Sequence, residues 1–181
     1  MKYIISTIAL IALFALIPNG MVFATVEADG TARLAWQEAK SDTRVSKLTS
    51  YLAYQNSLLT AEASHFVAEA DRLNLDWKFV AAISGVESTF GKFTPTGSYN
   101  GWGWGIPTGA QWGVAFKDWK EGITSVSEGL RYNYIDKGAV TIEQIGRIYA
   151  ASPTWSWKVR FFMDQIQSFA PIRPNLIEVT L

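Results

Sequence analysis

The stretch Asp76–Gly91, with the sequence D-W-K-F-V-A-A-I-S-G-V-E-S-T-F-G, decides how this chain can fold. Asp76 has the side chain of a helix N-cap, and the residues after it are mostly apolar. Val80, Ile83 and Glu87 follow at three- and four-residue spacing, which predicts a helix with a carboxylate on its inward face. Gly91 is expected to follow the end of this helix.

Glu87 is therefore the candidate catalytic residue. Partial burial and the negative end of the helix dipole both disfavour a charged carboxylate, so we expect the pKa of Glu87 to be raised. A carboxylic acid that is protonated near neutral pH can donate a proton to a glycosidic oxygen. Two other readings remain open: Glu87 turns to solvent at a frayed helix end, or it pairs with Lys92.

The flanking segments carry the same helical spacing, so the predicted fold class is mainly α. Val45, Leu48 and Leu52 predict a short amphipathic helix ending near residues 56–57. Further helices are expected after the caps Thr60, Asp118 and Thr141, the last in a capping box with Gln144, and Gly138 is expected to close the helix after Asp118. A last helix carries an apolar stripe of Val159, Phe162, Met163 and Ile166.

Residues 94–113 break the helical pattern, with six Gly, two Pro and three Trp. Sugars present apolar C–H faces that pack on aromatic rings, so Asn100, Trp102 and Trp104 are predicted to line a glycan groove. For Trp102, Trp104 and Trp112 the alternative is burial beneath the loop. The other tryptophans near helices are expected to be packing residues: Trp119, Trp155 and Trp157.

Two motifs together resemble the lysozyme-like superfamily, in particular its glucosaminidase and lytic transglycosylase branches. They are Val86–Gly91, which closes the apolar helix, and Ser98–Ile106, with the sequence S-Y-N-G-W-G-W-G-I. The resemblance extends over about residues 60–166 and implies a lysozyme-like helical domain with a Gly/Trp-rich substrate loop. It also implies that Glu87 is catalytic, that Ser88 supports substrate binding, and that Tyr149 faces the acid.

The function implied by this resemblance is cleavage of β-1,4 bonds in peptidoglycan glycan strands, with Glu87 as general acid and later base. The enzyme would be of the endo-β-N-acetylglucosaminidase or lytic transglycosylase type. A second catalytic carboxylate is not evident, and the choice between hydrolysis and anhydro formation stays open. The alternatives are a glycan-binding domain without catalysis and an endoglycosidase acting on N-linked glycoprotein glycans.

Composition excludes several other classes of protein. A length of 181 residues is about that of one domain, and 16 basic residues balance 16 acidic ones, so no charge pattern indicates nucleic-acid binding. The absence of Cys and the single histidine, His65, exclude a disulfide scaffold, a thiolate zinc site and a multi-histidine site. We therefore expect no metal and no cofactor. The partner that the resemblance implies is peptidoglycan, and the chain is expected to be a monomer.

The N-terminal segment is expected to direct export. Lys2 precedes an apolar run over residues 3–17, and Val22-x-Ala24 is an acceptable cleavage site, so residues 1–24 are predicted to be a signal peptide. The alternative is an uncleaved membrane anchor, and both readings place the rest outside the cell or in its envelope. The remaining chain is divided into a polar linker or loosely docked helix (25–47), the catalytic domain (48–170) and a C-terminal tail (171–181).

Overall fold

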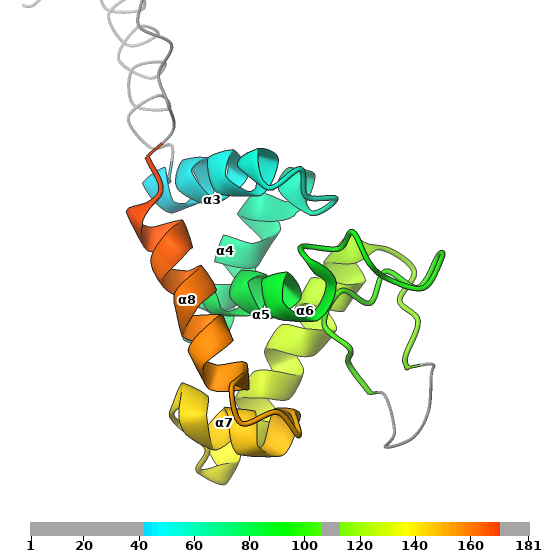
Figure 1. Cartoon of the computed structure of the whole chain (residues 1–181), viewed down its shortest axis with the longest axis vertical. Coiled ribbons are helices and arrows are strands. Elements are labelled where there is room, and N and C mark those ends of the chain that lie inside the picture. The colour runs from blue at the N-terminus through cyan, green and yellow to red at the C-terminus, as the bar shows by residue number, and fades with distance from the viewer. Residues whose placement is uncertain (1–41, 106–112, 171–181) are drawn as a thin grey trace, which may run out of the picture. The chain divides into compact units, whose positions relative to one another are not determined.

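The computed structural model describes residues 42–105 and 113–170, so the predicted signal peptide, most of the linker, Trp112 and the C-terminal tail lie outside the described residues. The described part is mainly helical and contains no strand (Figure 1). Its α-helices are α3 (Thr43–Tyr54), α4 (Ala63–Leu73), α5 (Phe79–Ser88), α6 (Trp119–Gly129), α7 (Ile142–Tyr149) and α8 (Trp155–Ser168). Three short segments complete it: the 3₁₀ turns η1 (Thr60–Glu62) and η3 (Ile135–Lys137), and the π-helical η2 (Leu130–Tyr134).

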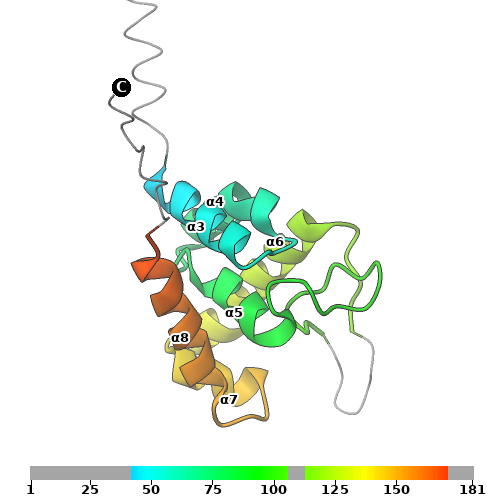
Figure 2. The ribbon, with the colours of Figure 1, turned by 45° about the horizontal axis from the view of Figure 1, so that its top comes forward.

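Helix α5 lies at the centre of the described unit (Figures 1 and 2). Eight of its ten residues are buried, because its side chains are small or apolar and other segments pack against nearly every side of the helix. Helices α8 and α6 contact α5, α4 packs on α6, and α3 contacts both α4 and α8. Gly85 of α5 lets the ring of Phe90 lie against the helix, since a Cβ atom there would be 2.6 Å from that ring.

Two of the capping residues predicted from the sequence are found at the ends of helices. Asp118 accepts a hydrogen bond of 2.8 Å from the backbone N–H of Glu121, and Thr141 and Gln144 form both bonds of the predicted capping box. These two predicted caps are confirmed. Gly138 has a φ of 96° and ends η3, because the chain after α6 continues through η2 and η3 before it turns.

Two other predicted caps are wrong. Thr60 lies inside η1 and donates to the carbonyl oxygen of Ser57, and α4 begins only at Ala63. Asp76 accepts from the N–H of Lys78, but α5 begins one residue later, without a side-chain cap. In both cases the polar side chain stabilises the turn that precedes the helix.

The folded unit begins at Asp42, six residues before the predicted boundary. Asp42 caps α3, and Arg44 joins it to Asp71 of α4 through ion pairs of 2.6 and 2.7 Å. The start of α3 also contacts the C-terminal helix. The Nζ atom of Lys47 donates 2.7 Å to the carbonyl oxygen of Gln167, so the start of α3 lies beside the end of α8 (Figure 1). Within the described ranges, no helix has the length and apolar character needed to cross a bilayer.

Candidate active site

Glu87 lies in the last turn of α5, where this helix leaves the core. Glu87 as a residue is exposed, whereas Val80 and Ile83 on the same face of α5 are buried, so the prediction that this face is inward at Glu87 is wrong. The predicted partial burial of its carboxyl is confirmed. Helix α5 is buried on nearly all sides, and on such a helix the spacing of residues does not single out one inward face. The predicted alternative pairing with Lys92 is also wrong, because Lys92 donates to the carbonyl oxygen of Gln55 at 2.8 Å.

The backbone turn after Glu87 is strained. Thr89, Phe90 and Gly91 have consecutive φ values of 52°, 60° and 83°, and the left-handed region costs a residue with a side chain roughly 1–2 kcal/mol. Phe90 is held in this conformation because its ring is fully buried and its N–H donates 3.0 Å to the carbonyl oxygen of Ser84. Strain of this kind clusters at functional sites, where it fixes the direction of a nearby side chain.

One hydrogen bond to the Glu87 carboxyl is found among the described residues. The indole N–H of Trp155, the first residue of α8, donates 2.7 Å to Oε1 of Glu87. The ring of Trp155 is buried, so the carboxyl rests on the edge of the core although the Glu87 side chain as a whole is exposed.

Burial raises the pKa of Glu87 above its ordinary value, as the sequence predicted. Two weaker effects act in the opposite direction: the hydrogen bond from Trp155 and the positive charge of Lys158, both of which favour the carboxylate. Glu87 therefore holds its proton more tightly than a free glutamate, yet its charged form has two stabilising neighbours.

Four aromatic side chains form what we call the aromatic wall: Trp104, Tyr134, Tyr149 and Trp155. The rings of Tyr149 and Trp155 are stacked, with centroids 4.8 Å apart and planes at 26°. The ring of Trp104 lies 5.8 Å from Tyr149 and 6.1 Å from Tyr134. The wall therefore begins at the residue that binds Glu87 and continues to a pocket of about 230 Å³, lined by Gly103, Trp104, Gly105, Tyr134, Ile148 and Tyr149.

Tyr149 is the member of the wall that the resemblance placed opposite the acid. Its hydroxyl donates 2.6 Å to the carbonyl oxygen of Trp102. Burial raises the pKa of Tyr149 well above its ordinary value, and the nearby charge of Glu87 raises it further. Tyr149 thus lies within electrostatic reach of Glu87 and acts as a hydrogen-bond donor rather than as a base.

Trp102 does not face a ligand, which corrects the prediction that its ring lines a groove. Its side chain is 0% exposed, and its indole N–H donates 2.9 Å to the carbonyl oxygen of Val80 in α5. The ring fills the space beside Gly122 of α6, where a Cβ atom would come within 2.7 Å of it. The predicted alternative, burial beneath the loop, describes Trp102 correctly, whereas Trp104 lies half-buried at the pocket.

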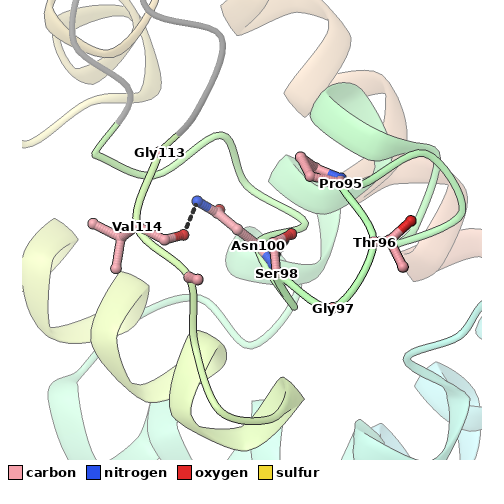
Figure 3. A pocket seen from close by; sticks show the side chains of 8 residues that line it. Pro95, Thr96, Gly97, Ser98, Asn100, Gly113 and Val114 are labelled. Carbon is pink, nitrogen blue, oxygen red and sulfur yellow. Dashed lines mark hydrogen bonds between the residues drawn. The ribbon is translucent and has the colours of Figure 1, made fainter.

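Asn100 and Ser88 hold the loop in place through hydrogen bonds to backbone carbonyl oxygens. Asn100 donates to the carbonyl oxygens of Trp104 and Val114 at 2.9 and 2.8 Å, the second bond being drawn in Figure 3. The buried Ser88 hydroxyl donates 2.7 Å to the carbonyl oxygen of Gly101, which joins the end of α5 to the loop. The polar atoms of both side chains bond to the backbone, and their expected contacts with substrate stay a prediction.

A second pocket of about 350 Å³ lies along the same loop (Figure 3). It is lined by Pro95, Thr96, Gly97, Ser98, Asn100, Gly113, Val114 and Ala115. None of these residues has an ionisable side chain, so this pocket supplies binding surface but no acid or base.

The sequence did not point to Trp155 as part of the site, although the expectation that it packs in the core is correct. One property of the residue could have indicated its role: the N–H of a buried tryptophan needs a hydrogen-bond acceptor, and a carboxylate can be that acceptor. Trp157, also expected to pack, is 66% exposed.

His65 has the structural role expected of it, with Nε2 2.9 Å from the hydroxyl of Thr124. No group of three or more His, Cys, Asp or Glu side chains that could hold a metal ion occurs in residues 42–105 and 113–170.

No model of a known protein family matches this sequence. A comparison with curated proteins likewise finds no significant relative. The geometry around Glu87 therefore carries the functional argument.

Proposed function

We propose that this chain is an exported glycosidase that cleaves β-1,4 bonds in peptidoglycan glycan strands, with Glu87 as general acid and later base. The observation that carries the proposal is the state of the Glu87 carboxyl, which is reachable from solvent and has a pKa raised by burial. General-acid catalysis requires this combination, because the acid must be protonated and must also reach the leaving oxygen.

In the first step Glu87 donates its proton to the glycosidic oxygen while the bond from that oxygen to the anomeric carbon breaks. The leaving sugar departs with a new hydroxyl group. In the second step the Glu87 carboxylate takes a proton from a water molecule as the water oxygen attacks the anomeric carbon. The bond that joined this carbon to the nucleophile of the first step breaks, and Glu87 is protonated again. Between the two steps, Trp155 and Lys158 stabilise the carboxylate.

The nucleophile of the first step is assigned to the substrate. Mechanisms with two carboxylates place the second about 5–10 Å from the acid. Among the described residues, Lys158 is the charged group that influences the pKa of Glu87, and no carboxylate does so. We therefore assign the attack on the anomeric carbon to the N-acetyl oxygen of the sugar itself, an alternative known for some glycosidases.

The aromatic wall provides a surface for the sugar rings. The half-buried ring of Trp104 borders the 230 Å³ pocket together with Tyr134 and Tyr149, and aromatic rings suit the apolar faces of sugars. The mainly helical fold, with the Glu87-Ser88 pair closing its central helix, supports a lysozyme-like domain in which residues 94–113 form the substrate loop.

Two other functions share the same surface: a domain that binds glycan without cutting it, and an endoglycosidase for N-linked glycoprotein glycans. The raised pKa of Glu87 favours an enzyme over a binding domain, because binding alone has no need for a protonated carboxyl. The exported location is proposed from the segment 1–24.

The test is digestion of purified peptidoglycan sacculi, with released fragments identified by mass spectrometry. Glu87→Gln keeps the shape of the side chain and removes the proton, so we expect turnover to fall about 10²–10⁴-fold. Glu143→Gln is the matched control, since Glu143 is an exposed glutamate engaged with Arg160, and its turnover should match the wild type. Wild-type turnover in a folded Glu87→Gln variant would refute the mechanism, and binding without release by the wild type would favour a binding domain.

A further inference from the structure

The two oxygens of the Glu87 carboxyl have different surroundings. Oε1 accepts the indole N–H of Trp155 at 2.7 Å, whereas among the described residues no donor to Oε2 is found. In a protonated carboxyl group, one oxygen carries the proton and donates, and the other is the better acceptor. An N–H donor fixed on Oε1 therefore favours the proton on Oε2.

We propose that Trp155 is a positioning residue for Glu87, whose indole N–H holds Oε1 as an acceptor and so leaves the transferable proton on Oε2. This inference rests on the proposed acid role of Glu87. It adds a fourth element, α8, to a site that the sequence assigned to α5, the Gly/Trp-rich loop and α7.

The indole is held in this orientation from three sides. Its ring is 2% exposed at the start of α8, and Tyr149 of α7 stacks on it at 4.8 Å. Tyr149 is itself fixed through its hydroxyl bond to the Trp102 carbonyl. Helix α7 approaches the indole closely at Gly146, where a Cβ atom would lie 2.9 Å from the ring of Trp155. A donor held this firmly selects one carboxyl oxygen over the other.

The groups that act on Glu87 from the neighbouring elements are few. Helix α8 contributes the indole of Trp155 and the positive charge of Lys158. On α7, the charge of Glu87 raises the pKa of Tyr149. Tyr134 of η2 acts on Tyr149, one residue further along the aromatic wall. Trp155 is thus the one described neighbour that acts on Glu87 through a directional hydrogen bond.

The same bond has a second effect after proton transfer. A hydrogen bond to a charged carboxylate is stronger than one to a neutral acid, so Trp155 binds Glu87 more tightly as the proton leaves. An interaction that strengthens in the transition state raises kcat and has little effect on KM.

Trp155→Phe tests this role, because phenylalanine keeps a ring for Tyr149 to stack on and lacks the N–H. We expect kcat to fall about 10–100-fold, the effect of losing a hydrogen bond to a charged group, with KM nearly unchanged. The alkaline limb of the pH profile should move to higher pH, since the lost bond had lowered the pKa of Glu87. Trp157→Phe is the matched control, because it makes the same change two residues along α8 at an exposed position. It should leave kcat, KM and the alkaline limb unchanged.

A second measurement needs neither catalysis nor the Trp155→Phe variant. In the exported chain, the indole N–H resonance of Trp155 should shift with pH at the titration of the Glu87 carboxyl, followed by ¹³C NMR, and this shift should disappear in Glu87→Gln. The indole of Trp157 should not respond. A Trp155 resonance that ignores the titration of Glu87, or an unmoved alkaline limb in folded Trp155→Phe, would overturn the proposal. If instead Glu87→Gln still cleaves sacculi while the two resonances titrate together, the proposed function fails and the hydrogen-bond assignment stands.

Discussion

The hydroxyl of Tyr149 donates a 2.6 Å hydrogen bond to the backbone carbonyl of Trp102, which joins the end of α7 to the Gly/Trp-rich loop. On the other side of the loop, the Trp102 indole donates to Val80 of α5. Residues 100–102 are therefore buried in the core, held by α5 and α7 together, whereas Trp104 is half-buried and contributes its ring to the pocket beside the aromatic wall.

Trp102→Ala should mainly affect stability. Replacing a fully buried tryptophan costs roughly 3–5 kcal/mol, so we expect the free energy of unfolding to fall by about that amount in chemical denaturation. Glycan affinity per folded molecule should be unchanged, because the ring does not reach a ligand. Loss of affinity without loss of stability would contradict the buried position.

Trp104→Ala should weaken glycan binding. Its ring borders the 230 Å³ pocket, and an aromatic contact contributes about 0.5–1.5 kcal/mol beyond the area it buries. Isothermal titration with a soluble peptidoglycan oligosaccharide, in the Glu87→Gln background, measures the change in affinity. The control is Trp157→Ala, an exposed tryptophan outside this pocket, and equal losses in both variants would mean that the pocket is not the sugar site.

Glu87→Gln should stabilise the fold at neutral pH. The pKa of Glu87 is raised in the folded chain, so folding favours the protonated form, and stability is lost as pH rises from the unfolded pKa through the folded one. Glutamine carries no charge and avoids this loss. We therefore expect Tm of the variant to exceed that of the wild type at pH 7, and the difference to shrink in melts near pH 3. A difference that is constant across this range would show that the titration of Glu87 is not its cause.

Thr89→Gly should relieve backbone strain. Thr89 has a φ of 52°, which a β-branched residue rarely adopts, so we expect a gain of roughly 0.5–1 kcal/mol in the free energy of unfolding after the entropy of glycine is subtracted. Asn74→Gly at the end of α4 is a suitable comparison, because asparagine tolerates its φ of 50° and should gain less. Denaturant titrations of the two variants give the answer, and a larger gain at Asn74 would argue against strain at Thr89.

The helical frame was predictable because its signals are local. Asp118 and Thr141 each bond to the backbone three residues ahead, and such caps can be read from a few neighbouring letters. The apolar stripe predicted on α8 is confirmed in the same way, since Val159 and Ile166 are fully buried. The sequence left residues 25–47 as a linker or a loosely docked helix, because the first turn of α3 is held by ion pairs rather than by apolar burial.

The loop and the acid were less predictable, because long-range bonds decide them. The side-chain amide of Asn100 donates a hydrogen bond to the carbonyl oxygen of Val114, fourteen residues later, and the spacing of residues in the sequence does not predict such a bond. The raised pKa of Glu87 was correctly expected, but its hydrogen-bond partner, Trp155, lies 68 residues away on another helix. Only the folded chain brings these groups together.

The contact between Lys47 and Gln167 has a consequence for how this unit can be used in a longer chain. Its two ends meet at one corner, whereas Trp155 and Glu87 lie at the opposite end of α8, about 20 Å away for a helix of 14 residues. A unit built in this way can be inserted into a loop of another protein, or circularly permuted by a short connection between its ends. Neither change requires Glu87 or Trp155 to move, so the corner at which the described unit would be joined to another chain lies apart from the proposed site.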